Sequence, residues 1–213
     1  ITTWSHQGLA PGELRLPAGV RRVAVVDRTS GGVAAPAVMG FSGAALHRGG
    51  VELAPVEVVA SALAGDAAAV LTAPVGPASA LAMCARTDAQ GLVMAHSVTP
   101  DPFWNFEKQG GGGWVAHYNA RARVGFRVWD CAGRRLHDLE QDGWHTVSAE
   151  GADRSEARAA VSADRVAAAD QAAVAEAGRT LADALVPTPM ERQRPVFVGG
   201  GLRPGVKHLQ VGD

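Results

Sequence analysis

Hydrophobic and polar positions alternate along residues 114–129, the clearest pattern in the chain. One set of alternate positions is apolar or small: Trp114, Ala116, Tyr118, Ala120, Ala122, Val124, Phe126 and Val128. The intervening set is mostly polar and includes His117, Arg121, Arg123 and Arg127. A period of two predicts a strand with one face on a core and the other toward water. At about 3.3 Å per residue such a strand spans roughly 50 Å, so we expect a bend, for which Gly125 is the candidate.

The residues that follow predict an antiparallel partner for this strand. Asp130, Cys131, Ala132 and Gly133 form a turn sequence. Residues 134–148 then carry Leu136, Leu139, Trp144 and Val147, so we expect them to return alongside the first strand. Together the two segments predict a long hairpin.

Shorter apolar runs predict further strands. Residues 23–26 and 92–95 are continuous apolar runs, which are typical of strands buried on both faces. Residues 195–198 predict an edge strand near the end of the chain. Between the first run and the first helix, residues 28–51 are rich in glycine and contain Pro36, so they predict a long loop.

Two helices are predicted between the first two buried strands. Residues 55–73 follow Pro55 with apolar side chains at spacings of three and four, on Val56, Val59, Leu63, Ala67 and Val70. Residues 79–87 predict a shorter helix with Leu81 and Cys84 facing inward.

The longest helical pattern covers residues 153–186. Asp153 and Glu156 resemble a capping box at its start, and Pro187 ends it. Gly178 weakens a helix by about 1 kcal/mol. The apolar stripe consists of Val166, Ala169, Ala173, Ala177, Leu181 and Leu185, whose small members allow close packing on a sheet.

The order of these elements predicts an α/β (α+β) fold, a mixed sheet with a long antiparallel hairpin and helices packed on it. We expect residues 1–20 to be an irregular lead-in, residues 21–198 to be a single α/β domain, and residues 199–213 to be a glycine-rich tail. A chain of 213 residues is long enough for one such domain with a sizeable core.

Composition narrows the class of protein. Apolar residues make up 47% of the chain and charged residues 19%, which is typical of a globular protein rather than a disordered one. The formal net charge of −1 makes nucleic acid a poor candidate partner. No run of 18 apolar residues predicts a membrane span. Cys84 and Cys131 could form one disulfide in an oxidising compartment, but two buried thiols are the simpler interpretation.

Known catalytic motifs do not fit the chain. The glycines at residues 110–113 precede a predicted strand rather than a helix, so they do not form a phosphate loop. The Gly-x-Ser-x-Gly motif and the close His or Cys spacings of zinc sites are absent. We therefore nominate no catalytic residue, metal ligand or cofactor. The alternative is a small metal-dependent hydrolase, if the hairpin brings His117, His137 and His145 together beside a carboxylate.

The polar side of the predicted long strand is the best binding candidate. Alternate positions lie about 6.6 Å apart on one sheet face. His117, Arg121, Arg123 and Arg127 could there bind an anionic ligand, a carboxylate-rich partner or anionic lipid. The simpler interpretation is a solvated face, partly paired with acidic residues of a neighbouring strand. An aromatic group flanks the glycine run and could cover a core edge or dock on a partner: Phe103, Trp104, Phe106 and Trp114.

Several segments resemble a known family in their order and residues. They are the strand at residues 23–29, the segment at residues 84–94, the strand end at residues 126–130, the Leu-Val-Pro-Thr-Pro run at residues 185–189, Arg194, and residues 197–200. Together they resemble an uncharacterised family of Gram-negative outer-membrane lipoproteins. The α/β domain of that family is similar to domains of TolB, LpoB and CsgG.

The resemblance implies a noncatalytic module of the cell envelope that binds a protein partner or forms a homo-oligomer. It implies a periplasmic location, with an outer-membrane anchor through a lipidated cysteine that this sequence does not include, and a helical repeat region after residue 213. It implies no catalytic residues. A pore or secretion-complex subunit similar to CsgG is an alternative, but the arginines of residues 114–129 oppose insertion into lipid unless they face a water-filled lumen.

Overall fold

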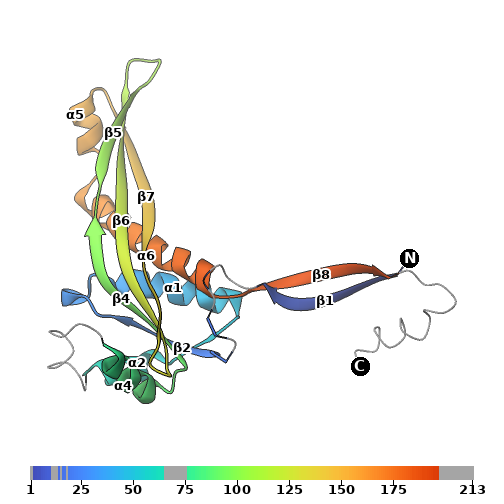
Figure 1. The fold of residues 1–213 in the computed structure, drawn as a ribbon. Helices are drawn as coiled ribbons and strands as arrows, with labels where there is room; N and C mark the ends of the chain where they lie inside the picture. Colours follow the sequence, from blue (N-terminus) through green and yellow to red (C-terminus); the bar gives the residue numbers. More distant parts are fainter. Residues whose placement is uncertain (1, 11–13, 15, 18, 65–75, 197–213) are drawn as a thin grey trace.

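A mixed six-stranded sheet forms the centre of the molecule (Figure 1). The computed structural model describes residues 2–10, 14, 16–17, 19–64 and 76–196. The strands of this sheet are β2 (Arg22–Asp27), β3 (Glu52–Leu53), β4 (Gly91–Pro100), β5 (Phe103–Lys108), β6 (Trp114–Asp130) and β7 (Arg135–Gly151). β2 runs parallel to β3 and β4, and the other pairings are antiparallel. The predicted fold class is therefore confirmed.

The β6–β7 hairpin is the longest feature of the sheet. Its register runs from Trp114 opposite Gly151 to Trp129 opposite Arg135. β4 and β5 follow one another along the other edge of β6. The predicted alternation holds, because the even-numbered residues from Ala116 to Val128 are buried.

Gly125 of β6 faces an irregularity in its neighbour. The β4–β6 register shifts between Ala95 and Ser97, so His96 is an extra residue there. A Cβ atom at Gly125 would collide with Ser97 and His96. Bulges bend the strands that carry them, and glycine leaves room for this one.

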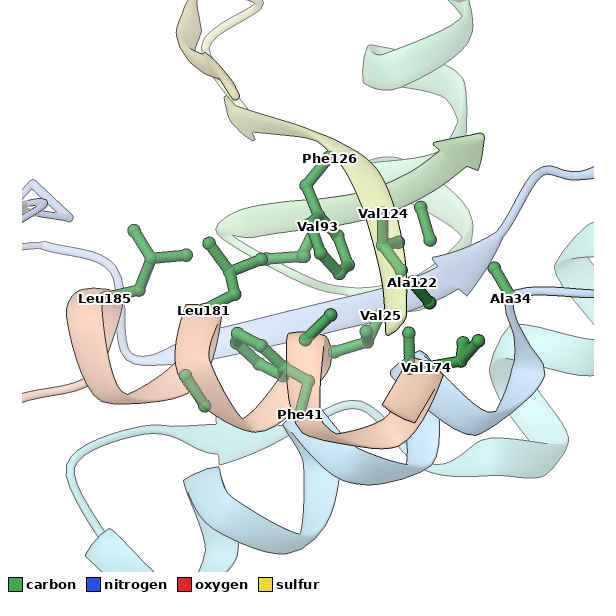
Figure 2. Packing of buried hydrophobic residues seen from close by; sticks show 14 of the residues in the cluster. Val25, Ala34, Phe41, Val93, Ala122, Val124, Phe126, Val174, Leu181 and Leu185 are labelled. Atoms are coloured by element: carbon green, nitrogen blue, oxygen red, sulfur yellow. The ribbon is translucent and has the colours of Figure 1, made fainter. Parts of the chain in front are cut away.

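Helices cover both faces of the sheet at its β2–β4 end. α1 (Ala35–Arg48) packs beside β2 and β3 on one face, which we call the inner face, and α6 (Ala163–Leu185) packs against α1 and extends along that face over β6 and β7. α2 (Val56–Ala64) and α4 (Pro77–Thr87) pack beside β2 and β4 on the other face. The inner core contains Phe41, Phe126, Leu181 and Leu185, all of them almost fully buried (Figure 2). No helix among the described residues is both long and apolar enough to cross a membrane.

The long loop predicted for residues 28–51 is wrong. The segment forms a short 3-10 turn at Ser30–Gly32 and then α1. Ala37, Phe41 and Ala45 form a buried stripe at a spacing of four. The glycines obscured this stripe, although Gly40 has a packing role, since a Cβ there would collide with the backbone of α6.

The prediction of an irregular lead-in is also wrong for part of its length. β1 (Thr2–Ala10) pairs antiparallel with β8 (Thr188–Val196), and these two strands form a separate sheet that extends from the body (Figure 1). The predicted edge strand at residues 195–198 begins earlier than expected and joins β1 instead of the main sheet. Residues 197–213, with the predicted tail, lie outside the described residues. The single domain of residues 21–198 remains a prediction.

The predicted helices begin and end differently in the structure. The pattern at residues 153–186 divides into α5 (Arg154–Ala159) and α6, because Ser162 caps the start of α6. Of the helix predicted over residues 55–73, the structure describes α2 and leaves residues 65–73 outside. The expected inward faces hold for Val59 and Cys84, whereas Val56 and Leu81 are exposed.

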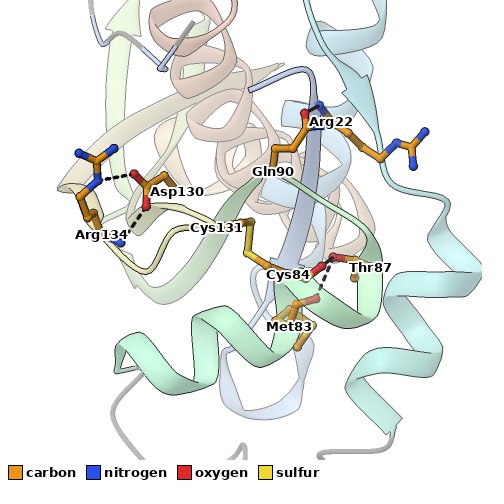
Figure 3. The surroundings of a disulfide bond; sticks show 8 residues. All are labelled: Arg22, Met83, Cys84, Thr87, Gln90, Asp130, Cys131 and Arg134. Carbon is orange, nitrogen blue, oxygen red and sulfur yellow. Dashed lines mark hydrogen bonds and ion pairs between the residues drawn. A yellow bond between two sulfur atoms is a disulfide. The ribbon is translucent and has the colours of Figure 1, made fainter. Parts of the chain in front are cut away.

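A disulfide joins Cys84 of α4 to Cys131 in the turn after β6 (Figure 3). The two Cα atoms lie 5.7 Å apart, within the range that a disulfide requires. The buried-thiol interpretation was therefore wrong. Beside it, Asp130 is buried and accepts hydrogen bonds from the backbone N–H and the Nε of Arg134. Burial alone would raise the pKa of Asp130, but the bonds from Arg134 hold it below its usual value.

Candidate interaction face

The side of β5, β6 and β7 opposite the inner face is named the outer face here. Residues that pair directly in an antiparallel ladder point to the same face, so the register defines its members. They are Phe103, Asn105, Glu107, His117, Asn119, Arg121, Arg123, Arg127, Asp138, Glu140, Asp142, Trp144, Thr146 and Ser148. In the described part of the chain, α5 and α6 pack on the inner side of these strands, while α2 and α4 pack beside β2 and β4. The outer face is therefore a sheet surface without a helical cover.

The predicted arginines lie together on the outer face, but each has an acidic partner on β7. The Nε of Arg123 lies 3.1 Å from Asp142 Oδ1, and the Nε of Arg127 lies 3.1 Å from Asp138 Oδ2. The Nη2 of Arg121 lies 3.3 Å from the second oxygen of Asp142. The arginines therefore form an ion-pair ladder with β7.

Two further carboxylates complete this ladder. Asp101 lies 3.5 Å from Arg121, and Glu140 lies 3.6 Å from Arg123. Arg135 also lies 3.0 Å from Asp138, so four carboxylates face four arginines and the ladder has no excess of positive charge. It therefore suits a mixed-charge protein surface better than an anionic ligand or anionic lipid.

Ionisation of the ladder follows from these contacts. The hydrogen bond from Arg123 lowers the pKa of Asp142, and the bond from Arg121 lowers it further. The same carboxylate raises the pKa of Arg123. Because side chains of both residues are half exposed, water screens the attraction, so the pair orders the face more than it stabilises the fold.

His117 lies at the β5 end of the outer face and does not join the other two histidines of the predicted metal site. Its Nδ1 is 2.7 Å from Ser148 Oγ, and its Nε2 is 3.7 Å from Glu107. His145 pairs with Ala120 and His137 with Val128, so both belong to the opposite side of the sheet. The described residues contain no group of three His, Cys, Asp or Glu side chains that could hold a metal ion.

No sequence pattern pointed to His96, the bulge residue beside the ladder. Its Nε2 lies 3.7 Å from Asp138. Burial lowers the pKa of His96, and the positive charge of Arg127 lowers it further, against the opposing effect of Asp138. His96 is therefore a neutral neighbour of the ladder near pH 7.

Trp144 lies on the outer face, a position that the apolar pattern of the returning strand does not predict. Half of its surface is exposed there. Its ring meets the edge of Phe103 at a centroid distance of 5.6 Å, and the Arg121 guanidinium lies 6.0 Å from its centroid. Only the register that pairs Trp144 with Arg121 could have predicted its exposure on the outer face. Trp144 is thus an exposed ring that two neighbours hold in place.

The rest of the predicted aromatic group lies on the inner face. Trp104 and Phe106 pair with Tyr118 and Ala116, which are buried. The group is therefore divided between the two sides of the sheet, with Phe103 alone on the outer face.

A small hollow with a volume of about 200 Å³ lies on the outer face. It is lined by Thr99, Pro100, Asp101, Arg121, Arg123 and Asp142. Sites for drug-sized ligands usually measure about 300–1,000 Å³. The geometry therefore favours contact with a macromolecule.

Comparison with known proteins does not assign the chain to a family. No family model matches it, and no curated protein matches it. A minor lipoprotein from Acinetobacter baumannii is similar over 76% of this chain and 90% of its own, with 8% identity and a TM-score of 0.42. The LpoB C-terminal domain from Salmonella enterica covers 60% of this chain and 84% of its own, with 13% identity and a TM-score of 0.35.

A third structure is an uncharacterized lipoprotein B from Nitrosomonas europaea. It covers 82% of this chain and 89% of its own, with 13% identity and a TM-score of 0.38. These three TM-scores and identities are too low to establish a common fold or function.

Proposed function

We propose that the chain is a noncatalytic interaction or assembly module of the cell envelope, and that its outer face binds a protein partner. The observation that carries this proposal is the uncovered sheet surface on which Trp144 is held between Phe103 and Arg121. Tryptophan, tyrosine and arginine are the residues most enriched among those that dominate binding energy. A ring that is already held in place loses little side-chain entropy on binding.

The ion-pair ladder supports a protein partner rather than a small ligand. Rims of protein interfaces are polar and accessible, and charges there set orientation and association rate. The ladder presents arginine and carboxylate groups side by side next to Trp144. A partner with complementary charges could therefore orient on the ladder while it covers the ring.

The Cys84–Cys131 disulfide supports the proposed compartment. Structural disulfides persist in the periplasm and in secreted proteins and are rare in the cytosol. The proposal follows the sequence resemblance in placing the module in the periplasm, with an outer-membrane anchor in the full-length protein.

Photocrosslinking in intact cells tests the proposed face. A photoreactive residue replaces Asn105, which is exposed on the outer face two residues along β5 from Phe103, the ring that contacts Trp144. We expect a discrete adduct with one envelope protein. The Trp144→Ala variant should reduce its yield at least fivefold, whereas Arg179→Ala on α6 should leave it unchanged.

The control position is Gln171, which is exposed on α6 at the inner side of the sheet. A photoreactive residue there should give no such adduct. Equal adducts from both positions, or a yield that Trp144→Ala does not change in a folded variant, would contradict the proposal.

A further inference from the structure

β5 has one unpaired edge. The N–H of Gln109 donates to the carbonyl of Gly113 at 2.8 Å, which closes the β5–β6 turn. Backbone groups in an antiparallel pair alternate in direction, so the even-numbered residues of β5 point their N–H and C=O groups away from β6. These residues are Trp104, Phe106 and Lys108, and no other described strand pairs with them. This edge can accept another strand.

Side chains of the same even-numbered residues lie on the inner face, under two arginines of α5. The guanidinium of Arg154 lies 4.2 Å from the ring centroid of Trp114 and 5.8 Å from that of Phe106. The guanidinium of Arg158 lies 5.0 Å from the centroid of Trp104. Stacking covers the flat side of each guanidinium and leaves N–H groups at its rim free to donate.

Neither Arg154 nor Arg158 has an ion-pair partner among the described residues, although both side chains are exposed. The neighbouring carboxylates accept hydrogen bonds from backbone N–H groups at the start of α5 instead. Asp153 accepts a hydrogen bond from the N–H of Glu156 at 2.8 Å, and Glu156 accepts one from the N–H of Ala152 at 2.8 Å. These two arginines therefore differ from those of the outer face, which all have acidic partners.

A groove of about 610 Å³ runs beside these arginines. Its lining residues come from β5, α5, the segment after α5 and the start of α6: Trp104, Ser155, Arg158, Ala159, Val161, Ala163, Val166, Ala167 and Asp170. Inner-face side chains of an added strand would enter this space next to Trp104.

We propose that the free edge of β5 accepts an extended acidic segment of a partner protein as an additional strand, and that Arg154 and Arg158 bind its carboxylates. Side chains on one face of a strand repeat about every 6.6 Å, and residues four apart on a helix lie about 5–6 Å apart. Asp or Glu at alternate positions of the segment would therefore reach both guanidiniums. Backbone bonds to β5 supply affinity and the arginines supply selectivity. This surface is independent of the outer face.

A synthetic peptide of about eight residues, alternating glutamate and threonine and carrying a fluorophore, is the probe. Titrated with the full chain, it should bind at least tenfold more weakly to the Arg154→Ala, Arg158→Ala double variant. Arg179→Ala on α6 and Trp144→Ala on the outer face should leave its affinity unchanged. On binding, amide hydrogen exchange in residues 103–108 should slow at least fivefold.

Three outcomes would overturn the proposal. One is equal affinity for a peptide in which lysine replaces glutamate. Another is binding that leaves exchange in β5 unchanged, because the peptide would then be held by charge alone. The third is dimerisation of the chain through β5 without peptide, seen by sedimentation, because the occupant would then be a second copy. The Arg154→Lys, Arg158→Lys variant keeps both charges and should retain part of the affinity if the double alanine variant does not fold.

Discussion

Asp142 holds the centre of the outer face, because it contacts both Arg121 and Arg123. Its hydrogen bonds favour the ionised carboxylate, which lowers its pKa from the usual value of 3.8. A carboxyl group with a lowered folded-state pKa contributes stability above its unfolded pKa and loses it as pH falls through the folded value. The contacts of Asp142 with Arg121 and Arg123 should therefore persist to below pH 3.8 and come apart only in stronger acid.

Carbon-13 NMR of the Asp142 carboxyl group measures its pKa in the folded chain directly. We expect its titration midpoint below 3.8, and Arg123→Ala should move the midpoint upward because it removes the largest cause of the shift. Arg179→Ala is the matched control and should leave the midpoint in place. A midpoint above 3.8 in the unmodified chain would mean that the ladder does not form in solution.

The α1–α6 contact depends on two glycines. Gly40 and Gly178 each face the backbone of the other helix, where a Cβ atom would collide with Ala175 or Ala37. From the sequence alone, Gly178 is only a weak point in a helix. Its packing role depends on α1, which was itself predicted as a loop.

Gly178→Ala separates helix propensity from packing. Propensity alone would stabilise the protein by about 1 kcal/mol, but the methyl group would meet backbone that must move, and overpacking of this kind costs about 1–3 kcal/mol. We expect a net loss of stability in urea unfolding. Gly43→Ala, also in a helix but with no atom within 4 Å of the added Cβ, should be stabilising. A stabilised Gly178→Ala variant would show that the helices lie further apart.

Structural features that depend on neighbouring residues could be predicted from the sequence. Features that depend on contacts between distant segments could not. The alternation of β6 was enough to predict a strand, because one-sided burial follows from local spacing. The acidic residues that neutralise its arginines lie on β7, and which of them face Arg121 depends on register. The pairing of β1 with β8 likewise joins opposite ends of the described chain. The amino-acid composition favours neither the β6–β7 register nor the β1–β8 pairing.

At the scale of the whole molecule, one end of the sheet is covered by helices on both faces and fixed by the Cys84–Cys131 disulfide. The β5–β7 end carries the uncovered outer face and the free edge of β5. Binding surfaces are held in position more precisely when a rigid part of the fold supports them. The covered end thus provides the scaffold for contact surfaces at the other end.

Oxidative footprinting of Trp144 tests most directly whether a partner covers the outer face. The indole of Trp144 is half exposed in the isolated chain, and Met39 on α1 is 67% exposed on the helical side. We expect Trp144 to be oxidised at least fivefold more slowly in intact cells than in purified protein, with the rate at Met39 as the internal reference. Equal relative oxidation of Trp144 in cells and in purified protein would contradict a bound outer face.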